Sequence, residues 1–192
     1  LSSEAALHAH GISPTRRTPA GLALKLQHRT AASPREEPAE AREPGEWAKS
    51  CAADALTFHL TGGEADAIVL YELLFSKLTG IWLRFEDRHG DPMAIALPPD
   101  AIRPVGLDHA DFLIPEDPRV FRGFHYLREY FWFARKFLAF EITGLKRALS
   151  FVETNRFDIV IGFSDAHVRL PQIVSKRAVS LYAAPAVNLF EK

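Results

Sequence analysis

Residues 121–140 read FRGFHYLREYFWFARKFLAF, and nine of these twenty residues are Phe, Tyr or Trp. Each aromatic side chain buries a large area, so we expect this block to lie at the energetic centre of the fold. The spacing in its first half predicts a helical face, and the alternation from residue 137 to 142 predicts a strand. These two patterns give the predicted core residues, which are Tyr126, Leu127, Tyr130, Phe131 and Phe137.

The same block also predicts a surface that meets another chain. Phe131, Trp132 and Phe133 are consecutive, which leaves aromatic rings on more than one side of a helix. Trp132 is rotated by about 100° from Phe131 and should lie nearer the rim of the core. Because Trp and Arg are enriched among residues that dominate interfaces, we predict that Trp132 faces a partner together with Arg128 and Arg135. Packing of all the rings in the core is the open alternative.

Shorter patterns precede the aromatic block. Apolar residues at helical spacing, with acids in the first turn and Gly80 just past the end, predict a helix over residues 64–79. A strand–helix–strand unit followed by a hairpin is typical of α+β proteins, so we predict that class. The predicted strands are residues 22–26, 56–60, 81–85 and 93–97.

Composition divides the chain into three parts. Residues 1–29 form an N-terminal segment with one strand, and residues 51–192 form an α+β domain that contains the aromatic block. Residues 30–50 between them are rich in Pro, Glu and Ala and have no apolar stripe, so we predict a disordered loop. Because the chain begins with Leu1 and ends just after an apolar run, we expect it to be a piece of a larger polypeptide.

Charge and hydropathy exclude several classes of function. The 192 residues include 23 Lys or Arg and 24 Asp or Glu, for a net charge of −1, which gives no electrostatic attraction to nucleic acid. No apolar run approaches the roughly 20 residues that span a bilayer, so we expect no direct membrane insertion. The single cysteine, Cys51, rules out an internal disulfide.

A search for chemistry yields one cluster of note, Asp108, His109 and Asp111. Carboxylates beside an imidazole can hold a metal ion or shift the pKa of the imidazole. This cluster has no nearby nucleophile, and neither Cys51 nor the glycine pair at residues 62–63 belongs to a recognised catalytic or phosphate-binding pattern. We therefore predict no catalytic, cofactor-binding or metal-binding residues, with an enzyme or metal site at this cluster as the alternative.

Three motifs together resemble one known family. They are RPVGL at residues 103–107, GFHYLREYF at 123–131 and PAVNLF at 185–190. Their order and the residues around them are similar to TssF, also called VasA or ImpG, a baseplate subunit of type VI secretion systems. The likeness covers roughly residues 56–192. Ala134-Arg135 stands where the family usually has Pro-Glu, so the junction after the helix should be less sharply broken.

The resemblance implies a strand-rich α+β fold, with β-sandwich-like sheets and a few helices, in a fragment of a larger multi-domain subunit. It implies a structural, non-enzymatic role in the baseplate wedge, without cofactors, in support of contractile tail assembly. The implied location is the cytoplasm, where the baseplate docks at the inner-membrane complex. The implied partners are TssG, TssK, a second TssF copy and the VgrG hub region.

Two other functions stay open at this point. The first is a baseplate protein of a contractile, phage-tail-like particle. The second is a non-catalytic ligand-binding module, in which the aromatic block would line a cleft and stack a sugar or peptide. A flat apolar patch would favour an assembly role, whereas a closed concave pocket with a few polar groups would favour the binding module.

Overall fold

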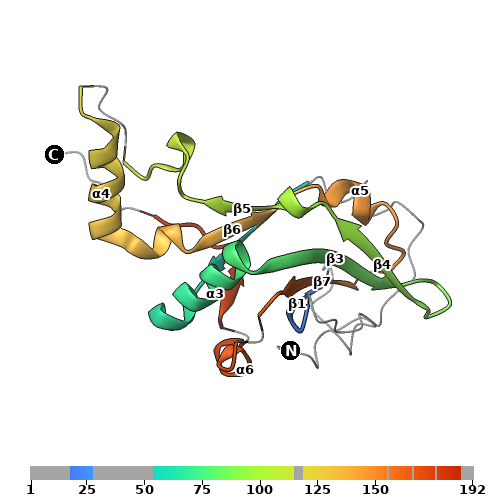
Figure 1. Ribbon diagram of the computed structural model, residues 1–192. Coiled ribbons are helices and arrows are strands. Elements are labelled where there is room, and N and C mark those ends of the chain that lie inside the picture. Colours follow the sequence, from blue (N-terminus) through green and yellow to red (C-terminus); the bar gives the residue numbers. More distant parts are fainter. Residues whose placement is uncertain are drawn as a thin grey trace.

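A computed structural model of the chain is shown in Figure 1. The predicted loop at residues 30–50, the predicted boundaries at residues 29 and 51, and Cys51 lie outside the described residues. The residues that the structure describes are 18–27, 54–114, 119–154, 156–165, 167–175 and 177–186.

Two four-stranded antiparallel sheets form the framework. The first sheet has the order β1-β7-β3-β4, and its strands are β1 Ala20–Gln27, β7 Arg156–Phe163, β3 Leu78–Glu86 and β4 Pro92–Leu97. The second has the order β5-β6-β2-β8, and its strands are β5 Ile102–Val105, β6 Ala139–Ile142, β2 Leu56–Leu60 and β8 Val179–Leu181. The predicted strand-rich α+β class with β-sandwich-like sheets is confirmed.

Within the described residues, four α-helices and three 3-10 turns connect the strands. The α-helices are α3 Glu64–Ser76, α4 Arg122–Phe133, α5 Leu145–Leu149 and α6 Leu170–Ile173. The 3-10 turns are η1 Pro99–Ala101, η2 His109–Asp111 and η3 Ala134–Phe137. None of the helices within the described residues combines the length and the apolar content that a membrane span requires.

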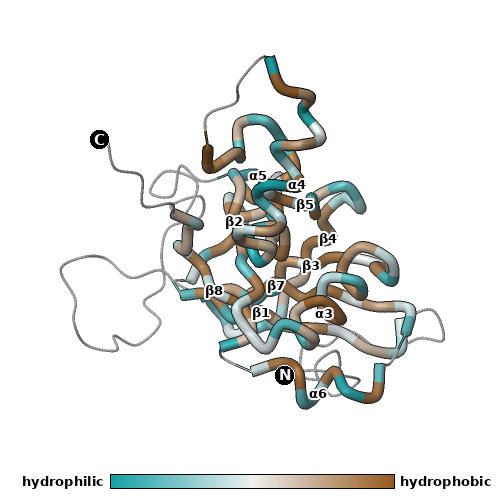
Figure 2. Tube along the Cα trace, turned by 90° about the vertical axis from the view of Figure 1, so that its left-hand side faces the viewer, coloured by the Kyte–Doolittle hydropathy of each residue, from teal (hydrophilic) through white to brown (hydrophobic). Residues whose placement is uncertain are grey.

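One apolar cluster joins the two sheets. Leu22, Leu83 and Ile159 come from three strands of the first sheet, and Phe58 and Phe140 come from the second. The Phe58 and Phe140 rings stack with centroids 5.2 Å apart and planes 18° from parallel. Figure 2 shows strongly hydrophobic stretches in the strands around β3, β4 and β7 and in α3. The core therefore lies between the sheets, with α3, α5 and α6 each burying residues against it.

The structure places most of the predicted core residues outside this cluster. Tyr126 and Phe137 are half-buried, whereas Leu127, Tyr130 and Phe131 are 53, 56 and 79 % exposed. The prediction that these five residues form the core is therefore wrong. The reason is the position of α4, which stands at one end of the molecule away from the first sheet (Figure 1) and buries His125 and Glu129 on its inner side.

Candidate protein–protein interface

Helix α4 presents large apolar side chains to solvent on several sides. Each of the seven side chains is at least 42 % exposed, and together they define the α4 aromatic surface: Phe121, Phe124, Leu127, Tyr130, Phe131, Trp132 and Phe133. Isolated exposed apolar residues are common, but a contiguous group of this size marks a site of interaction with another molecule. The rings belong to a helix that stands at one end of the molecule (Figure 1).

The three residues predicted to face a partner are accessible on or beside this surface. Trp132 is 66 % exposed, Arg135 in η3 is exposed, and Arg128 is half-buried. The Arg128 guanidinium lies 5.8 Å from the centroid of the Trp132 ring, which is cation–π geometry. The structure thus brings Arg128 and Trp132 together, while Arg135 follows one turn further along the chain.

A buried ion pair anchors the helix from beneath. The Lys136 ammonium group donates to the Glu129 carboxylate, and both side chains are only 2 % exposed. Glu129 also accepts hydrogen bonds from the backbone N–H of Leu113, at 2.7 Å, and of Ile114, at 3.2 Å. Because Glu129 binds Lys136 and the loop at once, it fixes residues 113–114 against α4.

Sequence reasoning missed this pair. Glu129 lies in α4 and Lys136 in η3, after the end of the helix, so regular helical spacing does not predict that the two side chains meet. The sequence does contain a hint of the pair, because both charged residues lie within the aromatic block. A charged side chain that is buried among aromatic rings is unfavourable unless an opposite charge pairs with it. The side of α4 that faces the rest of the protein is therefore the one that carries Glu129, and most of its aromatic side chains point to solvent.

Aromatic and polar contacts complete the attachment of the loop before α4. The Tyr126 hydroxyl donates to the carbonyl oxygen of Leu107 at 2.7 Å, and the Phe112 ring meets the Tyr126 ring edge-on at 4.9 Å. The Lys136 ammonium lies 5.3 Å from the centroid of the Phe112 ring. The loop and the helix therefore form one packed unit.

The predicted alternative site at Asp108, His109 and Asp111 is part of this loop. The Asp111 carboxylate accepts hydrogen bonds from the backbone N–H of Gly106, at 2.8 Å, and of Asp108, at 3.4 Å, and it forms a capping box with Asp108 around η2. The His109 ring packs edge-on against Phe112 at 5.4 Å. Over the described part of the chain, no three His, Cys, Asp or Glu side chains converge as metal ligands would.

His125 and Arg128 leave polar atoms buried under the surface. Arg128 Nη2 lies 3.0 Å from His125 Nδ1 and can donate a hydrogen bond to it. Among the described residues, His125 Nε2 and Arg128 Nε are buried without a hydrogen-bond partner. Buried polar atoms without hydrogen-bond partners lower the stability of the fold. The contacts of Glu129, Lys136 and Tyr126 described above stabilise the same region.

Gly106 is required at the point where the loop meets the helix end. Its φ is +96°, and a Cβ there would lie 3.1 Å from the carbonyl oxygen of Lys136. We expect Gly106→Ala to lower the free energy of unfolding by about 1–3 kcal/mol, because a non-glycine residue is strained at this φ. Urea denaturation measures the effect.

Gly90 in the β3–β4 turn is the matched control. Its φ is +85°, but a Cβ there would meet nothing within 4 Å. Gly90→Ala therefore carries the backbone strain without the crowding, and it should cost less than Gly106→Ala. Equal losses from the two substitutions would show that the contact with Lys136 contributes nothing.

Comparison with known proteins gives consistent matches. The family model described as "Type VI secretion system, TssF" matches residues 3–192. A curated relative, type VI secretion system component TssF1 of Pseudomonas aeruginosa, is 32 % identical over 143 residues, which cover 74 % of this chain and 23 % of the relative. The cryo-electron microscopy structure of a TssK-TssF-TssG baseplate subcomplex contains a chain with 25 % identity and a TM-score of 0.58, covering 71 % of this chain and 25 % of that one. The chain thus spans about a quarter of the length of these relatives.

Proposed function

This chain belongs to the TssF family of type VI secretion system proteins, and we propose that it forms part of the structural wedge of the baseplate. The proposed role is to hold other chains in place during assembly of the contractile tail, without catalysis. The proposed partners are TssG and TssK, which occur with TssF in the solved subcomplex, together with a second TssF copy and the VgrG hub region. The proposed location is the cytoplasm, at the inner-membrane complex.

The α4 aromatic surface is the observation that carries this proposal. Seven large apolar side chains remain exposed on one short helix, although burying each of them would be favourable by about 1.5–3 kcal/mol. A second chain that covers them recovers this free energy. We assign the contact to Arg128, Trp132 and Arg135 at its centre, since the stacked Arg128–Trp132 pair presents charge and ring together.

The anchoring of α4 supports an assembly role. The Glu129–Lys136 ion pair and the Tyr126 hydrogen bond to Leu107 hold the helix at a fixed angle to the loop. A surface that is rigid before binding loses less conformational entropy when a partner docks. The exposure of these side chains, 42 to 79 %, also argues against the alternative of an aromatic cleft, because such a cleft buries its lining.

Replacing Trp132 tests the assignment. In the full-length subunit we expect Trp132→Ala to weaken capture of purified TssG by about 30-fold, since a central tryptophan at an interface contributes about 2 kcal/mol or more. The melting temperature should stay within the error of wild type, because the ring is already 66 % exposed. Titration of TssG in a pull-down or by calorimetry measures the effect.

Ile68 provides a matched control on another helix. It is 50 % exposed on α3, so Ile68→Ala also removes an exposed apolar side chain, and it should leave TssG capture unchanged. If Trp132→Ala binds TssG, TssK and a second TssF copy as tightly as wild type does, the α4 aromatic surface is not the interface and the assignment fails.

A further inference from the structure

Three side chains on α4 connect the buried base of the helix to the α4 aromatic surface. His125 is 2 % exposed, Arg128 is half-buried and Trp132 is 66 % exposed. Arg128 Nη2 lies 3.0 Å from His125 Nδ1, and the guanidinium carbon of Arg128 lies 5.8 Å from the centroid of the Trp132 ring. The guanidinium group therefore contacts a buried imidazole and an exposed indole at the same time.

Packing fixes the position of the His125 ring. The Phe112 ring, from the loop before α4, lies 5.8 Å from it between ring centroids and is tilted by 30°. Phe112 is itself held by the Tyr126 ring and by the Lys136 ammonium group. A buried imidazole in such contacts has little freedom to move, so its Nδ1 atom is a fixed point that can orient Arg128.

The contact between His125 and Arg128 depends on the protons of the imidazole. Arginine can only donate hydrogen bonds, so Nδ1 accepts one from Arg128 only while Nδ1 carries no proton. The imidazolium ion carries a proton on both nitrogens, and it would lie 3.0 Å from a guanidinium group that keeps its charge at every accessible pH. Protonation of His125 therefore replaces a hydrogen bond with a contact between two positive charges.

The acids nearby already have other partners. The charged and titratable side chains at the base of α4 and in the loop packed against it are Arg128 and Glu129 on α4, Lys136 in η3, and Asp108, His109 and Asp111 in and beside η2. The Glu129 carboxylate binds Lys136, and the carboxylates of Asp108 and Asp111 accept backbone N–H groups around η2. The contact that His125 makes within this group of side chains is with the cation Arg128.

We propose that His125 is a positioning residue for the α4 aromatic surface. In its neutral form it holds the Arg128 guanidinium group beside the Trp132 ring, so both side chains are ordered before a partner docks and lose less conformational entropy on binding. A proton on His125 releases Arg128 and weakens the contact with the partner. This inference rests on the proposed assembly role of the surface, and it specifies how pH regulates that surface.

The pH dependence of TssG binding by the full-length subunit tests this role. Asparagine places an amide oxygen near the position of Nδ1 and cannot gain a proton, so His125→Asn keeps the acceptor and removes the titration. From about pH 8 to about pH 5.5, we expect the Kd of wild type to rise about tenfold more than that of His125→Asn. Calorimetry at the two pH values measures both, and the titratable groups of TssG itself cancel in the comparison.

Two further variants separate positioning from folding. His125→Leu removes the acceptor, and at pH 8 we expect it to bind TssG about tenfold more weakly than wild type, with His125→Asn recovering most of the loss. Arg128→Met removes the charge that a proton on His125 would meet, so its binding should be weak at both pH values without the additional loss at low pH. Arg128 is half-buried, so this variant decides the question if the His125 variants do not fold.

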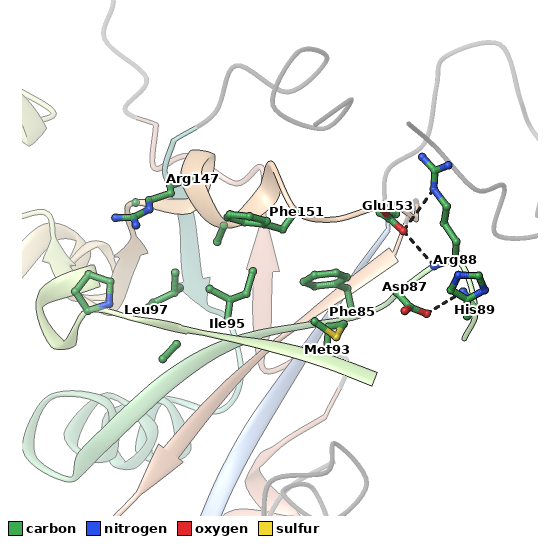
Figure 3. Close-up of a pocket in the computed structure, with 14 residues that line it drawn as sticks. Phe85, Asp87, Arg88, His89, Met93, Ile95, Leu97, Arg147, Phe151 and Glu153 are labelled. Atoms are coloured by element: carbon green, nitrogen blue, oxygen red, sulfur yellow. Dashed lines mark hydrogen bonds and ion pairs between the residues drawn. The ribbon is translucent and has the colours of Figure 1, made fainter. Parts of the chain in front are cut away.

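His89→Asn is the matched control at the opposite end of the molecule from α4 (Figure 1). His89 is exposed in the β3–β4 turn, where Figure 3 shows it beside Asp87 at one end of the groove between β4 and α5. The same substitution there also removes one titratable imidazole, and we expect it to keep the wild-type pH dependence. A pH dependence reduced as much by His89→Asn as by His125→Asn overturns the inference.

Fluorine NMR of the free full-length subunit separates this inference from the proposed function. With 5-fluorotryptophan incorporated, the Trp132 resonance is the one that Trp132→Phe lacks. We expect its chemical shift to change with pH in wild type but not in His125→Asn or Arg128→Met. An equal change in all three proteins, or equal pH dependence of TssG binding in wild type and His125→Asn, overturns the inference while the proposed function stands. If Trp132→Ala binds TssG as tightly as wild type does, the proposed function fails, and a Trp132 resonance that follows His125 still supports the positioning of Arg128.

Discussion

Replacing Phe140 with alanine is expected to lower the free energy of unfolding by about 3–5 kcal/mol. Phe140 is 0 % exposed in β6, and its ring stacks on Phe58 of β2 at the centre of the second sheet. The substitution removes the transfer free energy of the ring and leaves a cavity that the rigid sheets cannot close. Urea denaturation followed by circular dichroism measures the loss.

Phe131→Ala is the matched control, because it removes the same side chain from the same aromatic block. Phe131 is 79 % exposed, so we expect a change within about 0.5 kcal/mol. The sequence analysis predicts Phe131 as a core residue, so it would expect a large loss of stability from this substitution, whereas the structure leads us to expect a small one. A loss from Phe131→Ala as large as that from Phe140→Ala would mean that the ring is buried in solution.

Replacing Lys136 with methionine is expected to cost about 3–5 kcal/mol as well. Methionine retains most of the aliphatic stem but removes the ammonium group, which leaves the buried Glu129 carboxylate without its counterion. An unpaired charge in a site that is 2 % exposed is among the most unfavourable features a folded chain can carry. The free energy of unfolding at neutral pH measures the effect.

A double substitution separates the charge from the packing. Glu129→Gln removes the charge but keeps an oxygen that can accept the Leu113 and Ile114 N–H groups. The Glu129→Gln, Lys136→Met double variant should therefore be more stable than Lys136→Met alone. A double variant as unstable as the sum of the single changes would show that the two residues act independently.

An exposed ion pair shows how much less stability is lost when the pair is not buried. Arg169 and Asp66 lie 3.0 Å apart, with side chains 58 and 36 % exposed. Water solvates either partner when the other is removed, so Arg169→Met should cost less than about 1 kcal/mol. The difference between Arg169→Met and Lys136→Met measures what burial adds to an ion pair in this protein.

The strands that could be predicted from the sequence are those with one buried face. Residues 22–26, 56–60, 81–85 and 93–97 lie within β1, β2, β3 and β4, since alternation of apolar and polar residues reports a half-buried strand. Apolar residues at helical spacing predicted a helix over residues 64–79, and α3 occupies Glu64–Ser76 of that range. The last two predicted positions, residues 78 and 79, belong to β3.

Three strands, β5, β7 and β8, escaped prediction, and for β7 and β5 the physical reason is clear. β7 lies between β1 and β3, and adjacent residues such as Val160 and Ile161 are both 0 % exposed, so its sequence does not alternate. β5 is only four residues long and reads IRPV, with a proline at its third position. Its Pro104 is tolerated because β5 is an edge strand of its sheet.

The candidate site shows a different limit of sequence reasoning. Periodicity identified a helix in the aromatic block but could not decide which side of α4 faces the protein. That choice follows from Glu129 and Lys136, which bind each other and the loop before the helix. The accessible positions of Arg128, Trp132 and Arg135 agree with a partner-facing set, whose binding role is still a proposal.

The strand order of the first sheet has a consequence for how the protein folds during synthesis. β1 and β3 do not pair with each other, but both pair with β7, which is made last of the three. At about 5–20 residues per second, the ribosome completes β7 several seconds after β3. Until then β3 can pair only with β4 and β1 has no neighbouring strand, so the four-stranded sheet is completed only after β7 has been made.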